Sequence, residues 1–127
     1  MGTVSAEDLR QRTKRFALLI VKLSQQLTYG REARVIGDQL LRAGTAVAAN
    51  YRAACRGRSR AEFIAKLGIV VEEADETVFW CELLEEAGIA TPEVMQPVVG
   101  EARELLAIFS AARKTAKARK TAKARKV

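Results

Sequence analysis

Apolar side chains recur every three or four residues in four successive segments, which is the pattern of a helix with one buried face. The first two stripes are Leu9, Phe16, Leu19, Ile20, Leu23 and Leu27, then Ile36, Leu40, Ala43, Val47, Tyr51 and Ala54. The last two are Phe63, Leu67, Val70, Ala74, Val78 and Cys81, then Met95, Val98, Val99, Ala102, Leu105, Leu106 and Phe109. The pattern predicts an all-α fold with four long helices.

Residues that typically start or stop helices separate the four stripes. Ser5–Asp8 and Ser59–Glu62 resemble capping boxes, and Thr91-Pro92 is a cap followed by proline at the first helical position. The expected stop residues are Gly30, Gly57 and Gly88. Because all three connections are short, neighbouring helices should be antiparallel, giving an up-down-up-down four-helix bundle.

The second helix also carries a row of mostly small residues beside its main stripe. This row is Gly37, Leu41, Gly44, Ala48 and Cys55. Small side chains leave room for another backbone, so a neighbouring helix should approach closely along this row.

The third helix has a second row of residues at helical spacing, on the side away from its first stripe. We call this row, with the adjacent tryptophan, the third-helix seam: Ala65, Ile69, Glu72, Glu76, Phe79, Trp80 and Leu83. A monomeric bundle needs one apolar stripe per helix, and exposed Phe and Trp are typical of interfaces. The seam therefore predicts an oligomer interface formed by Ile69, Glu72, Glu76, Phe79, Trp80 and Leu83. The alternative is that the third helix is simply the most buried one.

Glu72 and Glu76 would need partners if the seam were covered, because unpaired buried carboxylates are costly. The outer face of the second helix offers candidates. They are Arg34, Arg42, Arg52 and Arg56.

Positive charge is concentrated at the end of the chain. The net charge is +7, but residues 113–127 hold eight basic residues and no acid, which leaves the rest at −1. The basic residues are Arg113, Lys114, Lys117, Arg119, Lys120, Lys123, Arg125 and Lys126. The hexamer KTAKAR occurs twice in tandem, at 114–119 and 120–125. We expect a bundle over 1–112 and, over 113–127, a basic low-complexity tail that is disordered because it has nothing to bury.

A second basic concentration lies between the second and third helices, with Arg52, Arg56, Arg58 and Arg60 around Gly57. Arginines beside a helix N-terminus can bind phosphate. They can equally neutralise nearby acids such as Glu62, and both interpretations stay open.

Signatures of catalysis and of cofactor binding are missing from the sequence. It has no histidine, which excludes His-based acid–base and nucleophilic sites. Cys55 and Cys81 are too few and too distant for a zinc site, and we expect two free thiols. The acids Glu72, Glu73, Asp75 and Glu76 are more typical of an ion-paired helix face than of a metal site. We expect a cytoplasmic protein without enzyme activity, cofactor, metal or membrane span.

Several short motifs, in this order, resemble a known family. They are Gln39-Leu40-Leu41-Arg42, Val47-Ala48-Ala49-Asn50-Tyr51, Arg58-Ser59-Arg60-Ala61-Glu62-Phe63 and Glu72-Glu73-Ala74-Asp75-Glu76-Thr77 with Trp80 and Leu83-Leu84. Together they resemble the four-helix-bundle proteins encoded in intervening sequences of bacterial large-subunit ribosomal RNA genes, over roughly residues 9–109.

The resemblance implies an up-down-up-down bundle, often assembled as a homopentameric ring. It also implies kinship with the accessory protein of diversity-generating retroelements, which works with a reverse transcriptase and nucleic acid. Two features depart from the family pattern: Ala53 stands where Glu is usual, and the repetitive tail from Arg113 is not part of the pattern.

Our leading hypothesis is a homo-oligomeric accessory protein that binds RNA or DNA through phosphates and without sequence preference. The tail would supply most of the affinity, with Arg56, Arg58 and Arg60 as a second contact. The rival hypothesis is an oligomeric scaffold that binds a protein partner through the seam or through an oligomer surface and does not bind nucleic acid.

Overall fold

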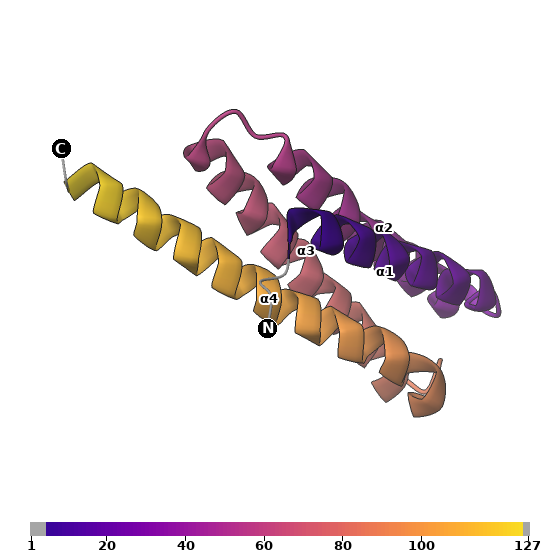
Figure 1. Ribbon diagram of the computed structural model, residues 1–127. Helices are drawn as coiled ribbons and strands as arrows, with labels where there is room; N and C mark the ends of the chain where they lie inside the picture. Colours follow the sequence, from indigo (N-terminus) through magenta and orange to yellow (C-terminus); the bar gives the residue numbers. More distant parts are fainter. Residues whose placement is uncertain (1–4, 126–127) are drawn as a thin grey trace.

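A computed structural model describes residues 5–125 as four helices and no strand. The helices are α1 (Ala6–Gln26), α2 (Arg31–Cys55), α3 (Arg60–Glu86) and α4 (Pro92–Arg125). Consecutive helices run antiparallel and pack against each other, and α1 also touches α4 (Figure 1). The predicted all-α four-helix bundle is confirmed.

Most members of the four predicted stripes lie in the core, which also includes Leu84 and Ala33 from outside them. Its largest fully buried side chains come from all four helices: Phe109, Ile20, Leu40, Leu67, Leu84, Met95 and Leu105. Members at the stripe edges are only partly buried: Leu19, Ile36, Phe63 and Leu106. The rings of Tyr51 and Phe109 lie 4.9 Å apart, centroid to centroid, and join α2 to α4.

The predicted helix starts are present, with one variation. Ser5 and Asp8 form a reciprocal capping box on α1. At α3 the Ser59 hydroxyl accepts from the Glu62 backbone N–H at 3.1 Å, but the Glu62 carboxylate accepts from the backbone N–H of Arg58 instead.

The expectation for Gly30 was wrong. The first helix already ends at Gln26, and Gly30 is the N-cap residue of α2 with φ +95°. A non-glycine residue rarely adopts this left-handed backbone. Gly88, with φ +73°, follows the end of α3 as expected.

The small-residue row of α2 packs against α1. A Cβ atom on Gly44 would lie 2.7 Å from a side-chain carbon of Ile20, and one on Gly37 would lie 3.3 Å from Leu27. The two backbones therefore approach as closely as the sequence predicted.

The tail is helical in the structure, which differs from the expected disorder. The helix α4 continues to Arg125, without a break at residue 113. Ala, Lys and Arg are strong helix formers, and extending an existing helix avoids the cost of nucleation. The methyl group of Ala116 is also buried, so this segment does have something to pack. The predicted residue Lys126 lies outside the described residues.

Candidate nucleic-acid interface

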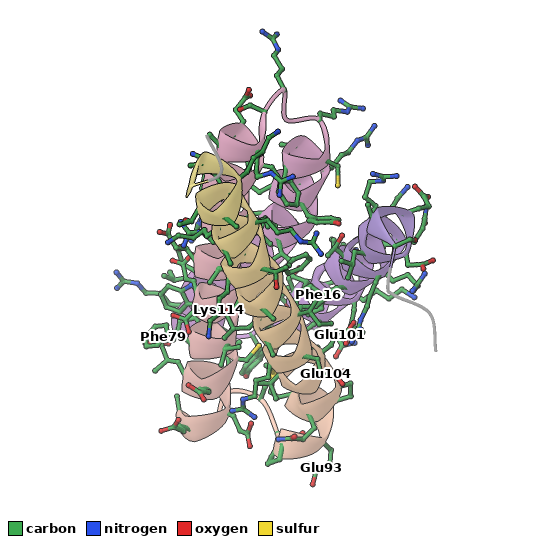
Figure 2. The ribbon with its side chains drawn as sticks, turned by 60° about the vertical axis from the view of Figure 1, so that its left-hand side comes forward. Phe16, Phe79, Glu93, Glu101, Glu104 and Lys114 are labelled. Carbon is green, nitrogen blue, oxygen red and sulfur yellow. The ribbon has the colours of Figure 1, made fainter. Side chains whose placement is uncertain are left out.

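Charge is segregated along α4. Its acidic residues Glu93, Glu101 and Glu104 lie in the N-terminal part, and Lys114 lies further along the same helix (Figure 2). No acid follows Glu104 in the sequence. Anionic side chains near a helix N-terminus and cationic ones near its C-terminus both complement the helix dipole, so this order also favours the long helix.

Most of the predicted tail cations are exposed on the surface, where they can contact a ligand. The exposed ones are Lys114, Lys117, Arg119, Lys120 and Lys123. The side chain of Arg125 and all of Lys126 lie outside the described residues.

Arg113 has a different role, because its side chain lies against α3. Its Nε donates to the Ile64 carbonyl at 3.2 Å, and the guanidinium covers Gly68, where a Cβ atom would lie only 3.1 Å from Nε. Arg113 therefore ties the basic half of α4 to the bundle instead of projecting into solvent.

The α2–α3 connection presents the three predicted loop arginines, Arg56, Arg58 and Arg60, on the surface. Among the ion pairs of the described residues, none joins them to Glu62. Arg60 also lines an open hollow of about 740 Å³ together with Arg10 of α1 and Arg119 of α4. The fold thus brings the loop and the tail to the same end of the bundle.

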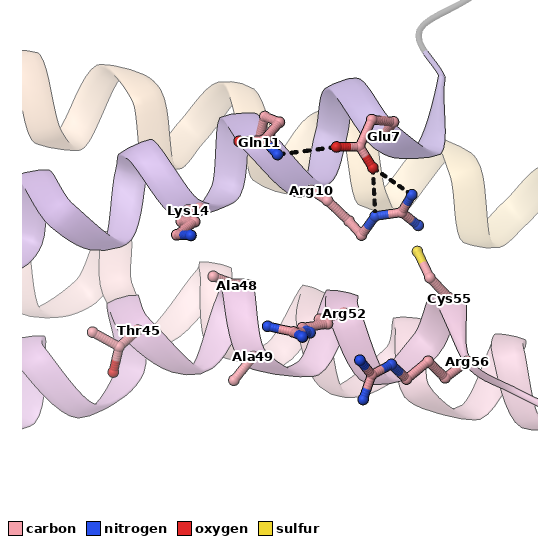
Figure 3. A pocket seen from close by; sticks show the side chains of 10 residues that line it. All are labelled: Glu7, Arg10, Gln11, Lys14, Thr45, Ala48, Ala49, Arg52, Cys55 and Arg56. Carbon is pink, nitrogen blue, oxygen red and sulfur yellow. Dashed lines mark hydrogen bonds and ion pairs between the residues drawn. The ribbon is translucent and has the colours of Figure 1, made fainter.

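Two further cations at this end, Arg10 and Lys14, were missed by the sequence analysis as site residues. With Arg52 and Arg56 they line an open groove of about 540 Å³ between α1 and α2 (Figure 3). The available signal was weak, because it consists of two separate pairs at helical spacing, 10/14 and 52/56, that only the antiparallel packing brings together.

The third-helix seam is an exposed apolar patch in this chain. Ile69 is 36% exposed and Phe79 52% exposed, and the Phe79 ring packs edge-on against Trp80 at 4.9 Å between centroids. Leu83 is partly buried and Glu72 is exposed. The helix α3 does pack against both α2 and α4, as the alternative of a most buried third helix supposes, but the side that carries Ile69 and Phe79 is exposed in this chain.

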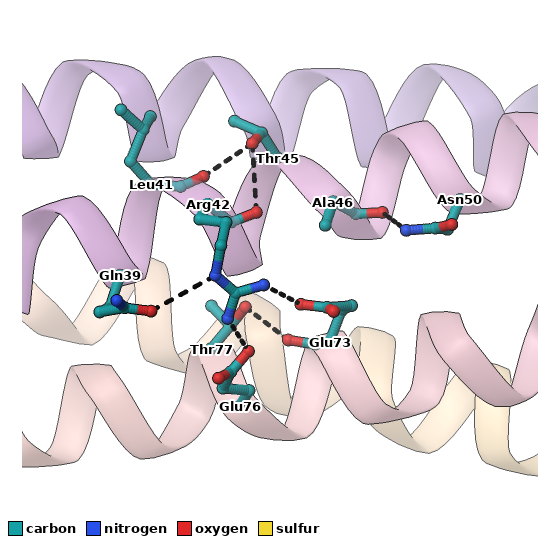
Figure 4. A network of polar contacts seen from close by, with 9 residues as sticks. All are labelled: Gln39, Leu41, Arg42, Thr45, Ala46, Asn50, Glu73, Glu76 and Thr77. Carbon is teal, nitrogen blue, oxygen red and sulfur yellow. Dashed lines mark hydrogen bonds and ion pairs between the residues drawn. The ribbon is translucent and has the colours of Figure 1, made fainter.

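The seam carboxylate Glu76 has the kind of partner that the sequence predicted. Arg42 of α2 donates to the carboxylates of Glu76 and Glu73, the latter at 3.2 Å (Figure 4). The second acid is therefore Glu73 and not Glu72. Burial raises the pKa of Glu73 while the Arg42 charge opposes that shift.

The remaining candidate chemistry is sparse. Both cysteines are free, and burial raises the pKa of the Cys81 thiol to about 12. Within the described part of the chain, no three His, Cys, Asp or Glu residues are grouped as a metal site would require. None of the described helices combines the length and the apolar character that a membrane crossing needs.

A family model and a solved structure agree in what this chain is similar to. The sequence model of the 23S rRNA-intervening sequence protein family matches residues 7–111. A crystal structure from Bacteroides thetaiotaomicron, described as a protein with unknown function from the S23 ribosomal protein family, superposes with a TM-score of 0.78. It is 34% identical in sequence, and the match covers 83% of this chain and 97% of that one. Among curated proteins there is no significant match.

Proposed function

The chain belongs to the 23S rRNA-intervening sequence protein family, and from this premise we propose that it is a non-enzymatic accessory protein that binds RNA or DNA. Binding is to phosphates and without sequence preference. The protein acts in the cytoplasm as a homo-oligomer. The family resemblance favours a pentamer and a reverse transcriptase or another protein as a further partner.

One observation carries the proposal: the cations of three separate segments lie at one end of the bundle. The α2–α3 loop, the exposed face of the tail and the first turns of α1 contribute, and Arg60, Arg119 and Arg10 line the same hollow. A surface of this kind has a polyanion as its natural partner, because each phosphate that it neutralises releases condensed counterions. Arginine and lysine contacts to phosphates position a nucleic acid but do not read its sequence.

The test is a salt-titrated gel shift with duplex DNA. One variant replaces Lys117, Arg119, Lys120 and Lys123 by Gln, which removes charge but keeps a helix-forming side chain. If about six cations engage the duplex, log K against log salt should have a slope near −5 for the native chain. The four-Gln variant should bind more weakly and with a flatter slope. A chain ending at Ala112 should also bind poorly, since the rest of the protein has net charge −1.

A second candidate function rests on the exposed apolar patch of the seam. In this case the protein is an oligomeric scaffold, and Ile69 and Phe79 contact a protein partner. Absence of polynucleotide binding by the native chain at low salt would reject the first proposal and favour the scaffold. Equal binding by the native and four-Gln chains would instead move the binding function to the bundle.

A further inference from the structure

The groove between α1 and α2 is lined by cations on both sides. Arg10 and Lys14 lie on α1, and Arg52 and Arg56 lie on α2 (Figure 3). One turn separates the two members of each pair, which is about 6 Å along the helix. That step is comparable to the distance between successive phosphates of a polynucleotide strand, so the four cations can meet a strand that follows the groove.

The size and lining of the groove select among nucleic-acid ligands. Its volume of about 540 Å³ is within the range of small-ligand pockets, roughly 300–1,000 Å³. A short stretch of one strand can lie in such a space, and a duplex is too wide to enter it.

Its lining also argues for backbone recognition. Ala48, Ala49 and Thr45 are among the lining residues on α2, and their small side chains let a strand approach closely. The lining residues include no aromatic side chain, and base stacking is the usual way of holding unpaired bases. The groove is therefore suited to the sugar-phosphate backbone and not to the bases.

The protein already places one anion in this groove. The Glu7 carboxylate accepts from Arg10 at 2.6 Å and 3.1 Å and from the Gln11 side-chain amide at 2.9 Å. These contacts lower the pKa of Glu7, with the Gln11 hydrogen bond as the largest cause. A phosphate that enters the groove must compete with this carboxylate for Arg10.

We infer that the α1–α2 groove binds the phosphate backbone of a single polynucleotide strand, and that Glu7 weakens this binding as an internal competitor. The inference rests on the proposed function, since it gives the bound nucleic acid a class and a location. The groove is a second binding surface, distinct from the tail. The tail binds duplex and single strand alike, whereas the groove binds only a single strand.

The experiment measures fluorescence anisotropy of the full chain with a labelled single-stranded oligouridylate of about 12 nucleotides. A duplex of the same length serves as the second probe. Lys14→Gln and Arg52→Gln each remove one groove cation. Lys22→Gln and Arg31→Gln are matched controls, because they remove an exposed cation from the same two helices outside the groove.

We expect each groove variant to bind the single strand about 2- to 5-fold more weakly, as for the loss of one solvent-exposed ion pair. The log–log salt slope should flatten by about 0.7 per lost contact. The controls should bind as the native chain does, and all four variants should keep their affinity for the duplex.

Glu7→Gln should instead raise single-strand affinity by a similar factor, while Glu32→Gln, also in the first turn of its helix, should not. Normal duplex binding with equal single-strand affinities for groove variants and controls would overturn this inference alone. Equal losses for both probes would overturn its preference for a single strand. No binding of either probe by the native chain would overturn the proposed function as well.

Discussion

Gly44 is the residue at which the packing of α1 on α2 is tightest. A Cβ atom there would lie 2.7, 2.9 and 3.0 Å from three side-chain carbons of Ile20, which is itself fully buried. Gly44→Ala should therefore lower the free energy of unfolding by about 1–3 kcal/mol, as overpacking does in a dense core. Urea denaturation measures this change.

Gly100 of α4 offers a matched control, because a Cβ atom there would meet nothing within 4 Å. Gly100→Ala should raise stability by roughly 0.5–1 kcal/mol, since glycine is a poor helix former. If Gly44→Ala were stabilising as well as Gly100→Ala, the Ile20 side chain would have to shift at little cost, and the contact at Gly44 would not be tight.

At the scale of single residues, the sequence predicts burial and close packing only where the type of the residue indicates them. The small-residue row was evident from spacing, whereas the buried positions of Thr13 and Thr77 were not, because threonine is polar. Their hydroxyls donate to carbonyl oxygens one turn earlier, at 2.8 and 2.7 Å, which removes the cost of burying them. Only the folded neighbourhood shows that both threonines face inward.

At the scale of elements, an ion pair fastens α1 to α4. Arg12 donates twice to the Glu101 carboxylate, at 2.7 and 2.8 Å, and the hydrogen bonds hold the pKa of Glu101 below its usual range. A carboxyl with a lowered folded-state pKa stabilises the fold above its unfolded pKa. This contribution is lost as the pH falls through the lower folded-state pKa.

Glu101→Gln should thus cost about 1 kcal/mol of unfolding free energy at neutral pH, the upper range for a partly exposed pair. The difference from the native chain should shrink as the pH falls below about 4.3, the ordinary pKa of a Glu carboxyl, and vanish only below the lowered folded-state pKa of Glu101. Thermal melts across this pH range measure it. Asp75→Asn, on the exposed face of α3, should leave the melting temperature at neutral pH close to the native value.

The course of α4 depends on Arg113. Its hydrogen bond to the Ile64 carbonyl and its packing over Gly68 attach the start of the basic segment to α3. Arg113→Ala should speed amide hydrogen exchange at residues 116–123, because the helix loses the hydrogen bond that joins this part of it to α3. Lys114→Ala, an exposed neighbour, should not speed it. Equal exchange in both variants would mean that helix propensity alone keeps this segment ordered.

The basic segment of α4 shows a limit of predicting structure from the local sequence pattern. The repeat KTAKAR has no amphipathic period, so the sequence indicated disorder. Yet one apolar residue, Ala116, reaches the bundle, and the helix that precedes it is already formed. Whether a chain continues as helix depends on the neighbours that the preceding helix places beside it, and these are not visible in the local pattern.

At the scale of the whole molecule, the fold class followed from the four stripes, but only part of the candidate site did. The loop arginines and tail lysines were visible because they are adjacent in sequence. Arg10 and Lys14 were not, since about forty residues separate them from Arg52 and Arg56 on the other side of the groove. A basic surface assembled from different helices is a property of the tertiary structure.

Self-association through the third-helix seam is the last prediction, and it too concerns the whole molecule. Phe79 is 52% exposed beside the partly buried Trp80, and an aromatic pair in such a position is typical of the centre of an interface. Light scattering of the purified chain should give a multiple of 13.9 kDa. Phe79→Glu should lower that mass at an unchanged melting profile, because an interface core does not accommodate an unpaired charge. Val35→Glu alters an equally exposed apolar residue outside the seam and should leave the assembly intact. A monomeric native chain at micromolar concentration would refute the seam as an interface.

If the assembly forms, it also brings several basic ends together in one particle. The effective concentration of these linked sites then converts weak phosphate contacts into tight binding. Phe79→Glu should then weaken polynucleotide binding while each chain keeps all of its cations.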